Sequence, residues 1–206
     1  MQKNVSAKTG KMVQLAILAA IVVLMAFTPL GYLQIGVVKI TFLMIPVVIG
    51  AIILGPGAGA VLGTVFGLTS FVQCFGLDTF GTTLMGIQPV YTFIMCMFPR
   101  ILMGALCGVI FKGLVRVDKT RHKVIAYPVT GLCGALLNTF FFVGLLMLFF
   151  GGSDYIMGMR GDLDWFAFVV AFVGLNGVIE AVVCVVVAAA VSKALDVVMK
   201  RQLMAE

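Results

Sequence analysis

The chain has 206 residues, of which 62% are hydrophobic and only 11% are charged, and its mean hydropathy is +1.20. A soluble domain is about 45–50% apolar and about 25% charged, so a soluble enzyme is excluded. Intrinsic disorder needs low hydrophobicity and is excluded by the same composition. A membrane-spanning helix needs roughly 20 apolar residues, so this length allows about six spans and no sizeable domain outside the bilayer.

Six apolar runs follow one another along the chain. They predict an all-α membrane protein, a compact bundle of six transmembrane helices that forms a single integral membrane domain over residues 1–206. We expect the helices at about 12–29, 41–55, 58–75, 89–113, 124–150 and 165–192. The runs are continuous and lack the alternation that is typical of barrel strands. Gly55-Pro56-Gly57 separates the second and third runs and predicts a tight helical hairpin.

Charge is distributed unevenly between the two ends of the predicted bundle. Of the 14 Lys and Arg residues, 11 lie in the N-terminal segment, after the fourth run or at the C-terminal end. They are Lys3, Lys8, Lys11, Lys112, Arg116, Lys119, Arg121, Lys123, Lys193, Lys200 and Arg201. The positive-inside rule therefore predicts a multi-pass cell-membrane protein with both termini in the cytoplasm. No basic stripe with interleaved aromatic residues occurs, so nucleic acid is not an expected partner.

The residues that most enzymes need are missing from the predicted membrane core. The only histidine, His122, lies in the basic segment after the fourth run. The glycine-rich stretch from Gly55 to Gly63 has no following Lys-Ser/Thr and continues into an apolar helix, so it is not a phosphate-binding loop. The five cysteines form no C-x-x-C pair. We predict no catalytic group, no metal site and no cofactor, and we expect any ATP hydrolysis to occur in separate subunits.

Glu180 is the only acidic residue inside an apolar run. A charge at the centre of a spanning helix costs roughly 2.5–3.5 kcal/mol on insertion scales, so such a residue usually faces a cavity or a partner. Asn176 lies four residues earlier and therefore on the same helix face. Two interpretations remain open: a solute-binding face, or an interhelical hydrogen bond that only stabilises the bundle.

Further polar residues gather toward the predicted external end. They include Lys39, Gln73, Gln88, Tyr91, Arg100 and Asn138. Each alone is typical of a headgroup contact, but together they fit a small pocket that opens outward. Arg100 is the best candidate for binding an anionic group, because its planar guanidinium suits a carboxylate. An equally good alternative is a structural contact of Arg100 with Asp78 or with backbone carbonyls.

Small residues recur four positions apart on three of the predicted helices. Gly59, Gly63 and Gly67 form one row, and Gly104-x-x-x-Gly108 forms another. Such spacing lets helix backbones approach closely in lipid, and packing within the chain is the expected role of the glycine rows. The alanine face of the first helix, defined as Ala16, Ala19 and Ala20, has no other evident role. We expect it to be a docking surface for another membrane protein.

Several short motifs occur along the chain in a characteristic order. They are Leu30-Gly31-Tyr32, Leu54-Gly55-Pro56, Pro99-Arg100-Ile101-Leu102 and Asn176-Gly177-x-x-Glu180, together with the alanine face. With six helices, about 200 residues and basic cytoplasmic ends, the chain resembles the substrate-binding S component of an energy-coupling factor (ECF) vitamin transporter. The resemblance covers essentially the whole chain.

This resemblance implies a high-affinity vitamin binder that cannot pump alone. Its expected partners are a transmembrane coupling protein, which contacts the alanine face, and two cytoplasmic ATPases. The implied vitamin-binding residues are Tyr32, Lys39, Gln73, Gln88, Tyr91, Arg100, Asn138, Asn176 and Glu180. We prefer pantothenate as the vitamin, with riboflavin or another vitamin as the alternative. A different class of function is an autonomous secondary transporter in which Glu180 carries a proton.

Overall fold

The computed structural model describes residues 2–35, 38–117 and 125–205. Long helices dominate, and one β-hairpin and several short helices interrupt them. In chain order the elements are α1 (Gln2–Ala26), the 3-10 turn η1 (Pro29–Gly31), β1 (Tyr32–Ile35), β2 (Val38–Thr41), α2 (Met44–Leu54), α3 (Pro56–Gln73), α4 (Thr79–Ile87), α5 (Pro89–Val117), α6 (Ala126–Phe150), α7 (Asp154–Arg160) and α8 (Trp165–Ala205).

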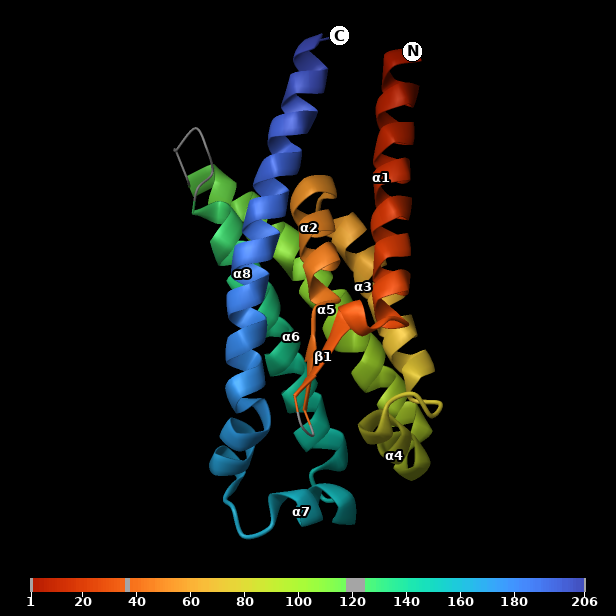
Figure 1. Cartoon of the computed structure of the whole chain (residues 1–206), viewed down its shortest axis with the longest axis vertical. Helices are drawn as coiled ribbons and strands as arrows, with labels where there is room; N and C mark the ends of the chain where they lie inside the picture. The colour runs from red at the N-terminus through yellow and green to blue at the C-terminus, as the bar shows by residue number, and fades with distance from the viewer. Residues whose placement is uncertain (1, 36–37, 118–124, 206) are drawn as a thin grey trace.

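The helices run roughly along one long axis, and both chain ends lie at the same end of the bundle (Figure 1). The short helices α4 and α7 lie at the opposite end, and α2 lies in the middle of the bundle. From Met44 to Ile52, every residue of α2 is buried. Because α2 is surrounded by other helices, no face of it meets water, and its sequence therefore carries no polar stripe.

Three helices of the described chain are long and apolar enough to cross a membrane: Lys8–Ala26, Pro89–Arg116 and Ala126–Phe150. A fourth candidate span consists of Trp165–Gly174 and Gly177–Val191, which meet at a bend of 45°. Gly174 has non-helical backbone angles at this bend. Together these helices make the protein a multi-pass helical membrane bundle.

The β-hairpin differs from the sequence prediction, which placed only a loop between the first two helices and began the second helix at residue 41. Tyr32 pairs with Thr41 in antiparallel register, and Ile35 pairs with Val38. Strand formation satisfies backbone N–H and C=O groups of a segment that lies against α8. In Figure 1 the hairpin is seen between α8 on one side and α3 and α4 on the other.

Helices α3 and α5 approach each other at the glycine row. A Cβ added to Gly59 would collide with the backbone of Gly104, and one added to Gly63 would collide with the carbonyl of Arg100. At Gly67 the nearest backbone atoms include the carbonyl oxygen of Cys96, 3.0 Å from an added Cβ. The glycine rows therefore pack within the chain, as predicted.

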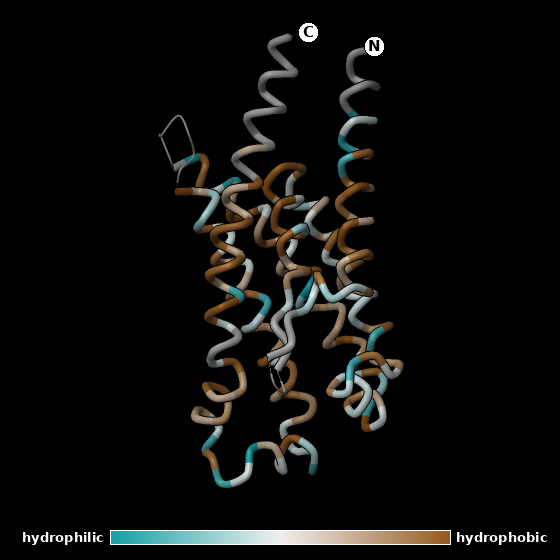
Figure 2. The backbone as a smooth tube through the Cα atoms, viewed as in Figure 1, coloured by the Kyte–Doolittle hydropathy of each residue, from teal (hydrophilic) through white to brown (hydrophobic). Residues whose placement is uncertain are grey.

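Hydrophobic residues cover much of the outer surface as well as the core. Leu148 and Phe140 are 73% and 71% exposed, which fits contact with lipid rather than water. Figure 2 shows hydrophobic residues along the middle of the helices, with hydrophilic residues concentrated near α4, near the connection from α7 to α8 and toward the start of α1. This distribution agrees with a bundle that has an apolar belt between two polar ends.

Candidate functional site

Arg100 lies on α5, directly after the internal proline Pro99. Proline has no N–H, so the carbonyl four residues earlier, that of Met95, loses its helical donor. The Arg100 Nη1 donates to the Met95 carbonyl oxygen at 2.7 Å and replaces that donor. The guanidinium also lies 5.4 Å from the ring centroid of Phe66 and 5.0 Å from that of Phe142. Pro99 and Arg100 therefore form one structural unit that fixes a positive charge inside the bundle.

The same guanidinium retains bonding capacity. Arg100 is only 9% exposed, and its Nε has no hydrogen-bond partner. On the neighbouring helix α6, Asn138 is 6% exposed and its Oδ1 also has no partner. Asn138 lies one helical turn from Phe142, the residue whose ring contacts Arg100. Buried polar atoms are almost always bonded, so an unpaired donor and an unpaired acceptor on adjacent helices are what a ligand site requires.

Glu180 on α8 is 8% exposed and accepts a hydrogen bond from the backbone N–H of Thr41 at 2.7 Å. This bond joins the end of β2 to the last helix. Arg100 also acts on the Glu180 carboxylate electrostatically. The acidic residue thus fixes the hairpin in the bundle while it lies within the field of the buried cation. The hydroxyl oxygen of Thr41 is buried without a partner, which adds a third unused polar atom.

Gln73 closes the opposite side of this region. Its Nε2 donates to the carbonyl of Ala26 at 2.6 Å, and so satisfies a carbonyl at the end of α1 that has no helical partner. The hydroxyl of Tyr32, the first residue of β1, lies beside the side chains of Gln73 and Ser70 and within the electrostatic influence of Arg100. Tyr32, Gln73, Arg100 and Glu180 are therefore brought together by the hairpin, α3, α5 and α8.

Two of the residues expected at the site lie elsewhere. Tyr91 is on α5 nine residues before Arg100, about 14 Å along the helix axis, and its ring stacks on Phe149 at 4.6 Å. Gln88 is exposed at the junction of α4 and α5. The structure does not bring these two side chains to Arg100. The side chains of Lys39 and Asn176 lie outside the described residues.

The alanine face of α1 is divided between two environments. Ala16 and Ala20 are exposed, whereas Ala19 packs against the buried core. Only the first two are therefore available to a partner at the surface of the bundle.

Several contacts near the site carried little signal in the sequence. Met95 and Thr41 contribute backbone groups, which no side-chain pattern reveals. The sulfurs of Cys74 and Cys96 lie 3.8 Å apart between α3 and α5, although 22 positions separate them in the chain. The hairpin had a usable signal, because β-branched and aromatic residues flank Gly36 in two short runs.

The chain matches known proteins over most of its length. The profile of the family described as "ECF transporter, substrate-specific component" matches residues 10–192. The "Pantothenate transporter PanT" of Leuconostoc mesenteroides is 28% identical over an alignment of 205 residues that covers 94% of this chain and 96% of that protein. The "Pantothenic acid transporter PanT" of Lactococcus lactis is 30% identical over an alignment of 172 residues that covers 77% of this chain and 78% of that protein. The chain therefore belongs to the family of substrate-specific components of ECF transporters, and it is a transporter subunit rather than an enzyme.

Proposed function

We propose that this chain is the high-affinity vitamin-binding subunit of an ATP-driven ECF importer, and that its vitamin is pantothenate. Two relatives that carry the name of pantothenate transporters support this choice. Pantothenate has one carboxylate, one amide and two hydroxyl groups, so it needs a cation together with neutral donors and acceptors. The region around Arg100 offers this combination.

The observation that carries the proposal is the buried, partly unsatisfied Arg100. Its Nε is a free donor, and the Oδ1 of Asn138 is a free acceptor on the adjacent helix. In our proposal the guanidinium binds the vitamin carboxylate, and Asn138 accepts a hydrogen bond from a hydroxyl or amide group. Glu180 acts as a second acceptor and holds the hairpin over the ligand through Thr41.

The proposed site extends beyond this centre. Tyr32 and Gln73 contribute polar atoms from the side of α3. The four remaining members of the proposed site are Lys39, Gln88, Tyr91 and Asn176. Gln88 and Tyr91 lie away from Arg100, at the start of α5, so in our proposal they contact a part of the vitamin distant from its carboxylate.

We further propose that residues 1–206 form a single membrane domain with six spans and with both termini in the cytoplasm. The accumulation of Lys and Arg at the terminal end of the bundle supports this orientation. A transmembrane coupling protein and two cytoplasmic ATPases complete the importer. The exposed Ala16 and Ala20 provide a smooth strip of α1 against which a helix of the coupling protein packs closely.

The binding half of the proposal is tested on the purified full-length chain in detergent. Mass spectrometry of small molecules retained through purification, followed by calorimetric titration, should identify pantothenate as a tight ligand. Riboflavin should bind at least a hundredfold more weakly, because the site is built around a carboxylate. Tight riboflavin binding with no pantothenate binding would refute the choice of vitamin and leave family membership intact.

The coupling half is tested by uptake of radiolabelled pantothenate into cells. Uptake should require co-expression of a coupling protein and its ATPases, and Ala16→Trp should abolish uptake without weakening binding. Ile21→Trp is the matched control, since Ile21 is 39% exposed and points about 140° around the helix from Ala16. Uptake by the chain alone that collapses with the proton gradient would instead support an autonomous transporter.

A further inference from the structure

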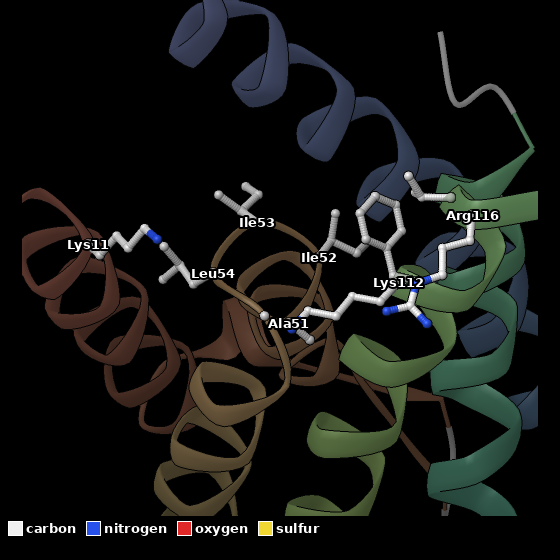
Figure 3. A pocket seen from close by; sticks show the side chains of 10 residues that line it. Lys11, Ala51, Ile52, Ile53, Leu54, Lys112 and Arg116 are labelled. Carbon is white, nitrogen blue, oxygen red and sulfur yellow. The ribbon is translucent and has the colours of Figure 1, made fainter. Parts of the chain in front are cut away.

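A second polar feature lies at the other end of the bundle from α4 and α7, where both chain termini are found. A pocket of about 370 Å³ opens there between α1, the end of α2 and the last turns of α5. Figure 3 shows Lys11 extending from α1 toward Leu54, with Lys112 and Arg116 on the α5 side. The vitamin site proposed above does not use any of these residues.

The charged residues that line this pocket are all positive. Lys11, Lys112 and Arg116 are all exposed, and among the residues that the structure describes no acidic side chain lines the pocket. The Nζ of Lys112 lies beside Gly55 at the C-terminal end of α2, 3.7 Å from where a Cβ on that glycine would stand. A cation there offsets the negative end of the helix. With Lys11 and Arg116, Lys112 makes the described lining of the pocket positive.

The depth of the cations in the bilayer indicates what kind of anion they meet. The span Lys8–Ala26 begins just before Lys11, and the span Pro89–Arg116 ends at Arg116. Both cations therefore lie at the ends of apolar spans, at the level where lipid headgroups meet the hydrocarbon. A soluble anion would meet an open, hydrated surface at this level, whereas a lipid phosphate is concentrated there by the membrane itself.

Other residues that line the pocket are apolar and can pack against the acyl chains of a lipid. Ile52, Leu54 and Phe111 line the pocket beside the cations. On α1 the neighbouring Met12 is 71% exposed and continues the apolar surface from the pocket toward the membrane. A positive pocket that borders an apolar surface is complementary to a phosphodiester headgroup with its acyl chains attached.

We infer that this pocket binds an anionic phospholipid. Lys11 and Arg116 hold the headgroup phosphate, and the part of the acyl chains nearest the headgroup packs against Ile52, Leu54 and Phe111. Lys112 keeps the C-terminal end of α2 from repelling the phosphate. The site selects lipids by headgroup charge and is independent of the identity of the vitamin.

The experiment uses the full-length chain in detergent, titrated with dioleoyl-phosphatidylglycerol or dioleoyl-phosphatidylcholine and monitored by native mass spectrometry. The wild-type protein should retain one phosphatidylglycerol in preference to phosphatidylcholine. A cation near the membrane surface contributes about a fivefold gain in affinity for anionic lipid. Lys11→Gln and Arg116→Gln should therefore each weaken phosphatidylglycerol binding about fivefold, and the double variant about 25-fold.

Lys8→Gln is the matched control, because it removes the same charge from the same helix without touching the pocket lining. Its phosphatidylglycerol affinity should stay at the wild-type value, and circular dichroism should show that every variant folds. Equal binding of the two lipids, or an equal loss in Lys8→Gln, would overturn the proposal.

Two further arms separate other sources of negative charge. Millimolar inorganic phosphate should leave bound phosphatidylglycerol in place, since free phosphate lacks the acyl contacts. An acidic polyglutamate peptide should compete poorly for the same reason. Displacement of the lipid by phosphate alone would assign the site to a soluble anion, and displacement by the peptide would assign it to an acidic protein segment. Either result would overturn the lipid assignment.

Discussion

The pairing of Pro99 with Arg100 leads to a prediction with a built-in internal control. If Arg100 replaces the donor that proline lacks, its structural role depends on that proline. Arg100→Ala in the natural background leaves the Met95 carbonyl buried and unbonded, at a cost of about 1–3 kcal/mol. It also removes the contacts with Phe66 and Phe142, each contributing about 0.5–2 kcal/mol. In the Pro99→Ala background residue 99 again donates to Met95, so only the ring contacts are lost.

The four proteins of this double-mutant cycle should be compared by reversible unfolding in mixed micelles of SDS and a mild detergent. We expect Arg100→Ala to cost about 1–3 kcal/mol more in the natural background than in the Pro99→Ala background, as a coupling free energy. Pantothenate affinity, measured by calorimetry, should fall in both backgrounds because the guanidinium is absent from both. Equal destabilisation in the two backgrounds would refute the structural role, and unchanged affinity would refute the ligand role.

Three other predictions concern contacts within the bundle. Gly63→Ala should lower the free energy of unfolding by about 1–3 kcal/mol through overpacking, whereas Gly57→Ala, which meets nothing within 4 Å, should not lower it. Glu180→Ala should lower the free energy of unfolding by about 1.5–3 kcal/mol, because it removes the hydrogen bond to the hairpin. Glu180→Gln should lower it less, because glutamine keeps an acceptor oxygen. Equal losses in the two variants would contradict this role of Glu180. Iodine, a two-electron oxidant, should convert Cys74 and Cys96 into a disulfide with loss of two protons, visible by peptide mass spectrometry. Two thiols that stay free would argue against the packing of α3 on α5.

The long helices were predictable because apolar composition alone determines where a chain can cross a bilayer. Each apolar run overlaps a helix of the structure, from α1 to α8. Helices α4 and α7 were missed, since nine and seven residues with mixed polarity give no membrane signal. The β-hairpin was missed for another reason: its β-branched and aromatic residues do favour strands, but they are also as apolar as a helix start.

Members of the candidate site could be predicted where a residue type is rare in the apolar segments. A buried cation and a buried acid stand out in a chain with so few charges, which is how Arg100 and Glu180 were found. Their partners could not be predicted, because Met95 and Thr41 contribute only backbone atoms. Tyr91 was assigned to the site for its polarity, and in the structure its ring stacks on Phe149. Sequence polarity does not distinguish a ligand contact from aromatic packing.

The close approach of α3 and α5 has a mechanical consequence. Backbone contacts at Gly59 and Gly63 leave no side chain between the two helices that could rotate to absorb a displacement. Sliding one helix along the other would drive these backbones into collision. Helices α3 and α5 therefore move together as one rigid body. The rest of the bundle offers two places for a rearrangement that admits or releases a solute. One is the hairpin, where the Glu180 carboxylate bonds to Thr41, and the other is α8 at the bend near Gly174.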